Sequence, residues 1–167
     1  VYRILGTPRQ LLEKTVLFWH GHFATGADKV TEPQLMLTQN QLLRRLAFAG
    51  FGELVHQISK DPAMLLYLDS ASNRKAHPNE NYARELMELF LLGVGNYTES
   101  DVEASSRAWT GHSYDSTTKT YLWRPTWHDA ARKSFLGVSI NRGTDGTLHG
   151  PETIDVMMST GIVPSTA

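Results

Sequence analysis

The fold is organised around Pro78-Asn-Glu-Asn-Tyr-Ala-Arg-Glu-Leu-Met-Glu-Leu-Phe-Leu-Leu-Gly93, a stretch that predicts one helix. Asn79 suits the N-cap, because its side chain can accept a hydrogen bond from the first free backbone N–H groups. Gly93 suits the position just past the last helical turn. At about 100° per residue, apolar side chains cover most of the circumference, which is typical of a buried helix. We therefore expect this helix at the centre of the protein.

The same helix carries an acidic stripe, in which Glu80, Glu85 and Glu88 surround Arg84. Buried carboxylates are costly unless they are paired, hydrogen-bonded or protonated. Two explanations stay open. Arg84 lies one turn from Glu80 and from Glu88, so it could form a structural ion-pair network with them. Alternatively, the carboxylates line a functional cleft, since carboxylates with shifted pKa values gather at such sites.

The composition excludes several classes of protein. The 167 residues suit a single domain, and 16 lysine and arginine residues against 17 aspartate and glutamate residues give a net charge of -1. No basic field is present to attract nucleic acid, and no apolar run approaches the ~20 residues of a membrane span. With no cysteine, the sequence excludes disulfides and thiolate catalysis.

Residues that start and end helices recur along the chain and predict a mainly α protein. Helix starts are marked by a cap followed by proline, or by a capping box, at Thr7-Pro8, Thr31-Glu32-Pro33, Asp61-Pro62 and Thr98-Glu-Ser-Asp101. Gly21 is expected to end the first helix. β-Branched and aromatic residues predict a hairpin at about 112–123. We expect a compact multi-helix bundle with this one hairpin, forming a single domain over residues 1–167.

The remaining helices follow from apolar residues at helical spacing. They are expected at about 33–48, 53–59, 62–68, 98–109 and 151–159, with a short helical turn at about 127–135.

Phe18-Trp-His-Gly-His-Phe23 suggests a divalent metal site. On a continuous helix, His20 and His22 would point apart, but a helix that ends at Gly21 would let the two imidazoles converge. With Glu85 and Glu88 they would suit zinc, iron or manganese. The spacing is not one of the strong zinc signatures, and histidines beside aromatic residues are commonly packed in a core.

The carboxylates suggest acid/base chemistry. Two carboxyl groups in unequal environments can divide into an acid and a base, as glycoside hydrolysis requires. Glu85 and Glu88, at positions i and i+3, lie about 5–6 Å apart at Cβ, which suits an ion-pair network equally well. We therefore expect one of them to work with a partner from His20, Asp101, His128 and Asp129.

Aromatic residues of the predicted hairpin could hold a substrate. Tyr121 and Trp123 alternate on one face, Trp127 follows closely, and such a shelf could bind a sugar beside the carboxylates. Arg84 completes the set of residues expected to contact substrate. The alternative is that these rings only cover the helical core.

Several phrases recur together, in order, in a known family. They include Phe18-Trp-His-Gly-His-Phe-Ala24, Asp61-Pro-Ala-Met-Leu65, the central stretch, Leu92-Gly-Val-Gly-Asn-Tyr-Thr98 and Ala108-Trp-Thr-Gly111. Over roughly residues 8–140 the chain resembles the large bacterial family numbered eighteen hundred in the domain-of-unknown-function series. The resemblance implies a helix-rich bacterial protein, often exported or periplasmic, and it implies no activity. It also implies a fragment of a longer protein, whose missing segments would leave apolar surface that favours a homo-oligomer.

Three hypotheses follow from the sequence. The first is a hydrolase that acts on a small molecule or saccharide, possessing a glycosidase-like carboxylate mechanism and needing no cofactor. The second is a metal-binding protein that uses His20, His22, Glu85 and Glu88. The third is a non-catalytic structural module of an exported complex, in which the acidic stripe is only a network around Arg84.

Overall fold

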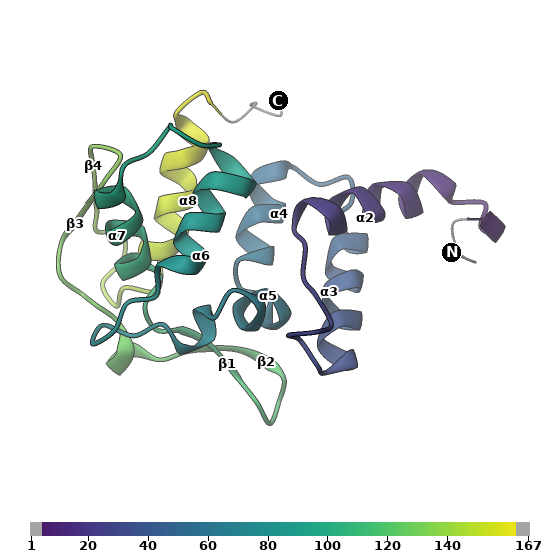
Figure 1. Cartoon of the computed structure of the whole chain (residues 1–167), viewed down its shortest axis with the longest axis horizontal. Helices are drawn as coiled ribbons and strands as arrows, with labels where there is room; N and C mark the ends of the chain where they lie inside the picture. Colours follow the sequence, from purple (N-terminus) through teal and green to yellow (C-terminus); the bar gives the residue numbers. More distant parts are fainter. Residues whose placement is uncertain (1–4, 163–167) are drawn as a thin grey trace.

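The computed structural model describes residues 5–162, and the protein is 51% helical. Seven α-helices lie in this range (Figure 1): α2 (Gln10–His22), α3 (Pro33–Arg45), α4 (Phe51–Ile58), α5 (Pro62–Tyr67), α6 (Glu80–Glu85), α7 (Glu99–Ala108) and α8 (His149–Ser159). The mainly α prediction is confirmed, although a helical bundle is not. None of the helices between residues 5 and 162 is long and apolar enough to cross a membrane.

The central helix begins where the sequence predicts and then changes its geometry. Asn79 caps α6, and its side chain accepts a hydrogen bond from the backbone N–H of Asn81 at 2.9 Å. From Leu86 to Leu91 the helix continues as a π-helix, η2, which the apolar pattern does not predict. The backbone N–H groups of Leu92 and Gly93 both donate to the Met87 carbonyl, and Gly93 has a φ of 77°. The wider turn therefore ends at the predicted glycine.

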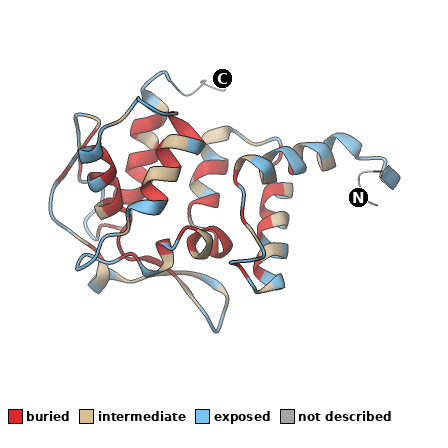
Figure 2. Ribbon diagram, in the orientation of Figure 1, coloured by how far each residue is buried: buried red, intermediate tan, exposed pale blue. Residues whose placement is uncertain are grey.

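The core surrounds this helix and reaches the other helices (Figure 2). Tyr82, Leu86 and Met87 are almost fully buried, as is Trp109 at the end of α7. The Trp109 indole donates to Thr153 of α8 at 3.1 Å, and Gly150 packs so closely that a Cβ there would lie 2.6 Å from the indole ring. Helices α7 and α8 pack against each other and against the central helix.

The chain forms two small antiparallel sheets in the segment that connects α7 to α8. The predicted hairpin at 112–123 is confirmed as β1 (His112–Asp115) paired with β2 (Thr120–Trp123). The helical turn predicted at 127–135 is wrong, because a 3-10 turn (Pro125–Trp127) is followed by a second hairpin, β3 (Lys133–Phe135) and β4 (Val138–Ile140). Leu136 and Gly137 connect these strands with φ angles of 48° and 77°, as a two-residue hairpin turn requires.

Some predicted helix boundaries are wrong as well. Gly21 does not end the first helix, because α2 continues through it to His22. The second helix ends at Arg45 rather than near residue 48, and α4 begins at Phe51 with Gly52 inside it. The caps at Asp61 and Thr98 are confirmed, since each side chain accepts a hydrogen bond from the backbone of its helix.

Candidate functional site

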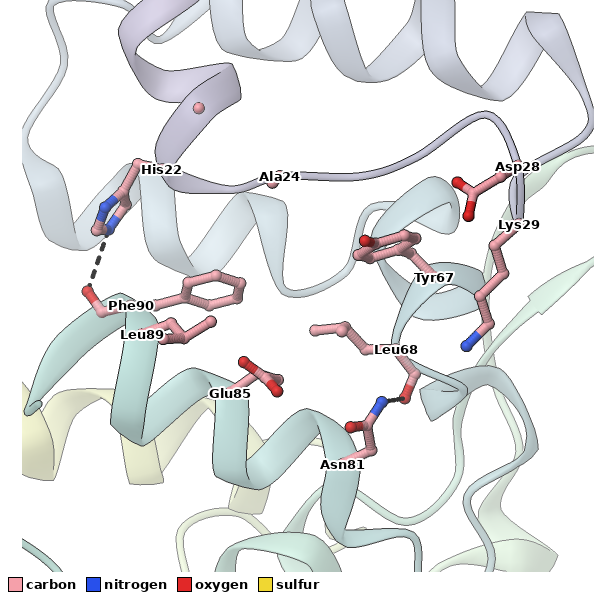
Figure 3. Close-up of a pocket in the computed structure, with 11 residues that line it drawn as sticks. His22, Ala24, Asp28, Lys29, Tyr67, Leu68, Asn81, Glu85, Leu89 and Phe90 are labelled. Carbon is pink, nitrogen blue, oxygen red and sulfur yellow. Dashed lines mark hydrogen bonds between the residues drawn. The ribbon is translucent and has the colours of Figure 1, made fainter. Parts of the chain in front are cut away.

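A cleft of about 470 Å³ lies between the end of α2 and the central helix. Its other walls come from the loop after α2 and from the end of α5, so four separate segments contribute side chains. The polar and aromatic residues that line it are His22, Asp28, Lys29, Tyr67, Asn81 and Glu85 (Figure 3). Leu68, Leu89 and Phe90 supply apolar surface.

Glu85 is the carboxylate that the central helix places in this cleft. Figure 3 shows its side chain among the labelled residues of both walls. The Glu85 side chain makes no hydrogen bond or ion pair with another residue of the described range 5–162. Partial burial, followed by the negative charge of Glu88, raises the pKa of the Glu85 carboxyl above its ordinary value, and Arg84 only partly opposes this. Glu85 therefore stays protonated to a higher pH than an ordinary glutamate.

The rest of the acidic stripe is paired outside the cleft. The Arg84 guanidinium donates two hydrogen bonds to Glu99, at 2.9 and 2.8 Å, and one to Glu80 at 3.3 Å. Glu88 instead accepts a hydrogen bond from the Tyr97 hydroxyl at 2.9 Å. The ion-pair network considered from the sequence therefore includes Glu80 and Glu99 but not Glu88, and Arg84 does not line the cleft.

His22 faces the same cleft as Glu85 from the opposite element. Its Nε2 lies 3.2 Å from the backbone carbonyl of Phe90, which can only accept, so Nε2 carries the hydrogen. That carbonyl is at the end of the π-helix, where backbone acceptors lack partners within the helix. Burial lowers the pKa of His22, so the ring is neutral and its Nδ1 holds a free lone pair.

His20 does not join His22. Because α2 continues through Gly21, residues 20 and 22 lie about 200° apart around the helix, and the predicted convergence of the two imidazoles is wrong. His22 lines the cleft and His20 does not. Within the part of the chain that the structure describes, no three histidine, aspartate or glutamate side chains lie together as a metal site needs.

His128 and Asp129 lie elsewhere and point apart. His128 Nδ1 is 2.8 Å from the Thr110 carbonyl, and its Nε2 is 2.9 Å from Nδ1 of His149. Asp129 forms an ion pair with Arg107 at 2.7 Å. His149 carries no spacing signal in the sequence that would have linked it to His128. Neither member of the predicted pair lines the cleft around Glu85.

The predicted aromatic shelf is not beside the carboxylates. Trp123 packs against His128, with ring centroids 5.0 Å apart, and the Arg74 and Arg124 guanidinium groups lie 5.1 and 4.7 Å from the centre of the Trp127 ring. Tyr121 lines a different hollow. The tyrosine in the cleft is Tyr67, the last residue of the short α5 helix. Sequence reasoning missed it, together with Asn81, whose side chain donates to the Leu68 carbonyl at 3.2 Å.

A family model matches the whole chain, residues 1–167, and its description is "Protein of unknown function (DUF1800)". The chain belongs to the DUF1800 family. The resemblance noted over residues 8–140 is thereby confirmed and extended to both ends of the sequence. No curated protein and no solved structure matches this DUF1800 chain. The case for a function therefore rests on the cleft.

Proposed function

We propose that this protein is a hydrolase that uses Glu85 as a general acid and His22 as a general base. The observation that carries the proposal is the pair of opposite pKa shifts in one cleft, upward for the Glu85 carboxyl and downward for the His22 imidazole. The upward shift favours the protonated carboxyl and the downward shift favours the neutral imidazole, which is the division of roles that acid/base catalysis needs.

Each group would hold its proton at a defined atom. Neutral His22 would accept a proton from water at Nδ1, while Nε2–H stays bonded to the Phe90 carbonyl. The water oxygen would attack the substrate carbon, the bond to the leaving oxygen would break, and Glu85 would donate its proton to that oxygen. Glu88 would support the acid from outside the cleft, because its charge disfavours ionisation of Glu85.

The lining favours a small polar substrate such as a saccharide. Asn81, Asp28 and Lys29 offer hydrogen-bonding groups, and the Tyr67 ring offers a flat apolar surface. Pockets that combine a few convergent polar groups with an aromatic wall are typical of small-molecule sites. We therefore retain glycosidic bonds as the proposed target, with no metal required for the chemistry.

The first experiment compares Glu85→Gln with Glu80→Gln on a panel of chromogenic glycosides and esters, with and without chelator. Glu85→Gln should lower kcat by about 10²-fold or more, because it removes the donated proton. Glu80→Gln removes an exposed carboxylate of the same helix and should leave kcat unchanged. No turnover by the wild-type protein, or full activity of Glu85→Gln, would contradict the proposal.

A pH profile distinguishes the proposed role of Glu85 as the acid from that of Glu88, whose charge raises the pKa of Glu85. Glu88→Gln should move the basic limb of the kcat/KM profile to lower pH, because Glu85 loses its proton more easily without the neighbouring negative charge. The Glu88→Gln protein should stay active below that limb. A profile that does not move would show that Glu85 is not the acid on that limb.

A non-catalytic structural module remains the second candidate. The observation that favours it is the network in which Arg84 pairs with Glu80 and Glu99 and so joins α6 to α7. If the stripe is only structural, Arg84→Met should lower the free energy of unfolding and no panel substrate should be cleaved. Elemental analysis of the purified protein tests the metal hypothesis in the same preparation.

A further inference from the structure

A second hollow, of about 400 Å³, shares no lining residue with the cleft around Glu85. It lies between α3, the turn from α4 into α5, and strand β2 of the first hairpin. The side chains relevant to its chemistry are Thr38, Gln41, Arg45, Gln57, Lys60 and Tyr121. Arg45 and Lys60 are cations, and Thr38, Gln41 and Gln57 are neutral side chains that can donate hydrogen bonds.

Neither cation has a counter-ion in the described part of the chain. The side chains of Lys60 and Arg45 form no ion pair and no hydrogen bond with any residue between positions 5 and 162. Lys60 is half-buried, and its ammonium lies 5.7 Å from the centre of the Tyr121 ring. Loss of water around this ammonium lowers the pKa of Lys60. A desolvated cation without a counter-charge is unfavourable, so an anion bound here would stabilise the arrangement.

The acidic groups nearby are already engaged. Asp61 lines the hollow, but its Oδ2 accepts hydrogen bonds from Gln39 Nε2 at 2.9 Å and from the Met64 backbone N–H at 3.1 Å. Glu32 forms an ion pair with Lys119, which links the start of α3 to the hairpin. Neither carboxylate pairs with Lys60, so the hollow keeps a positive character.

The Tyr121 ring is fixed as one wall. Its hydroxyl lies 3.0 Å from Nδ1 of His112, and burial raises the pKa of the Tyr121 hydroxyl to about 12. Burial, helped by the charge of Lys60, lowers the pKa of His112 to about 3, so the His112 ring is neutral. The hydroxyl is therefore occupied by His112, and the aromatic ring is what remains for a ligand.

We propose that this hollow binds an oxyanion, a carboxylate or phosphate group, through Lys60 and Arg45, and that the flat body carrying the group packs on Tyr121. Gln41, Gln57 and Thr38 supply neutral donors around the anion. The site would act independently of the cleft around Glu85, so its ligand need not be the substrate of that cleft. Tyr121, which the sequence suggested as part of a sugar-binding shelf, would thus bind the ligand of this second site.

Calorimetric titration with sodium phosphate and with sodium acetate, in a chloride buffer of matched ionic strength, tests the proposal. At least one of the two anions should bind the wild-type protein saturably. Lys60→Gln and Arg45→Gln should each weaken that binding by about 10-fold, as the loss of one charge-assisted contact predicts. The control is Lys14→Gln, an exposed lysine of α2 outside the hollow, which should change the Kd by less than about twofold.

Two further measurements keep the result independent of folding and of the hydrolase proposal. Lys60→Arg keeps the charge and should retain most of the affinity, whereas a folding defect would affect both Lys60 variants. Glu85→Gln should bind the anion as the wild type does. Absence of saturable binding by both anions, or equal binding by the wild type and Lys60→Gln, would overturn the proposal. Binding of phosphate alone, or of acetate alone, identifies the group that the site accepts.

Discussion

At the scale of single residues, Asp61 shows how burial and hydrogen bonding compete. Its carboxylate caps α5 and is held by Gln39, whose own Oε1 accepts a hydrogen bond from Thr25 at 2.5 Å. Burial nevertheless outweighs these bonds and raises the pKa of Asp61 from 3.8 to about 6. The folded state therefore holds this proton more tightly than the unfolded state does, and the contribution of Asp61 to stability falls as the pH rises from about 4 to about 6.

We predict that Asp61→Asn gains stability relative to the wild type as the pH rises. The amide oxygen can accept the same bonds without a buried charge, and the gain between pH 4 and pH 7 should be at most about 3 kcal/mol. Urea unfolding at both pH values measures it. Asp61→Ala is the control: it also lacks the titrating group and should gain with pH in the same way, but loss of the cap should leave it about 0.5–2 kcal/mol less stable than Asp61→Asn at either pH. A wild type that grows more stable than Asp61→Asn with rising pH would contradict the prediction.

At the scale of elements, the sequence predicted features whose signal is local. The caps at Asn79, Asp61 and Thr98 require only a side chain and the next backbone N–H groups. The second hairpin was missed because Leu136, a residue that seldom takes a positive φ, occupies the first turn position. The π-helix was missed because an apolar pattern read at α-helical spacing does not distinguish it.

The candidate site likewise contains residues that the sequence predicts and residues that only the tertiary structure identifies. The acidic stripe on the central helix made Glu85 a candidate from the sequence. The role of His22 could not be foreseen, because it depends on a carbonyl 68 residues away and on a helix that continues through Gly21. Lys29 reaches the cleft from the loop after α2, and Tyr67 reaches it from the end of α5. Both depend on tertiary packing, which leaves no periodic pattern in the sequence.

Gly21 itself gives a prediction for α2. It lies within a helix, and an added Cβ would meet nothing within 4 Å. Gly21→Ala should therefore raise the free energy of unfolding by about 0.5–1 kcal/mol, by reducing the freedom of the unfolded chain. Gly150→Ala is the opposite case, since its methyl group would strike Trp109 and should cost about 1–3 kcal/mol. Chemical denaturation measures both, and a loss of stability in Gly21→Ala would contradict the assignment of a continuous helix.

At the scale of the whole molecule, α2 projects from the side of the body (Figure 1) and carries exposed apolar side chains. Leu11 is 69% and Phe18 is 63% exposed, and at positions i and i+7 they share one face of the helix. Burial of such surface favours association, so the homo-oligomer expected from the sequence stays a prediction with a defined location.

Sedimentation equilibrium over a range of concentrations tests it. The wild-type protein should self-associate, and the double variant Leu11→Gln with Phe18→Gln should dissociate at concentrations about tenfold higher or more, since two apolar side chains leave the contact. The control is Val94→Gln, which changes an apolar residue that is 79% exposed in the loop after the central helix. A wild type that is monomeric throughout would remove α2 as an association surface.

The hydrogen bond from His22 to the Phe90 carbonyl joins the two walls of the cleft, and it has a consequence for how the protein responds to acid. The Nε2–H group donates this bond in the neutral ring and also in the protonated ring, because the added proton goes to Nδ1. Protonation would therefore disable the proposed base, while the hydrogen bond between α2 and the central helix persists. If the proposed hydrolase is inactivated by acid in this way, the inactivation should be reversible and should leave the contact between α2 and the central helix in place.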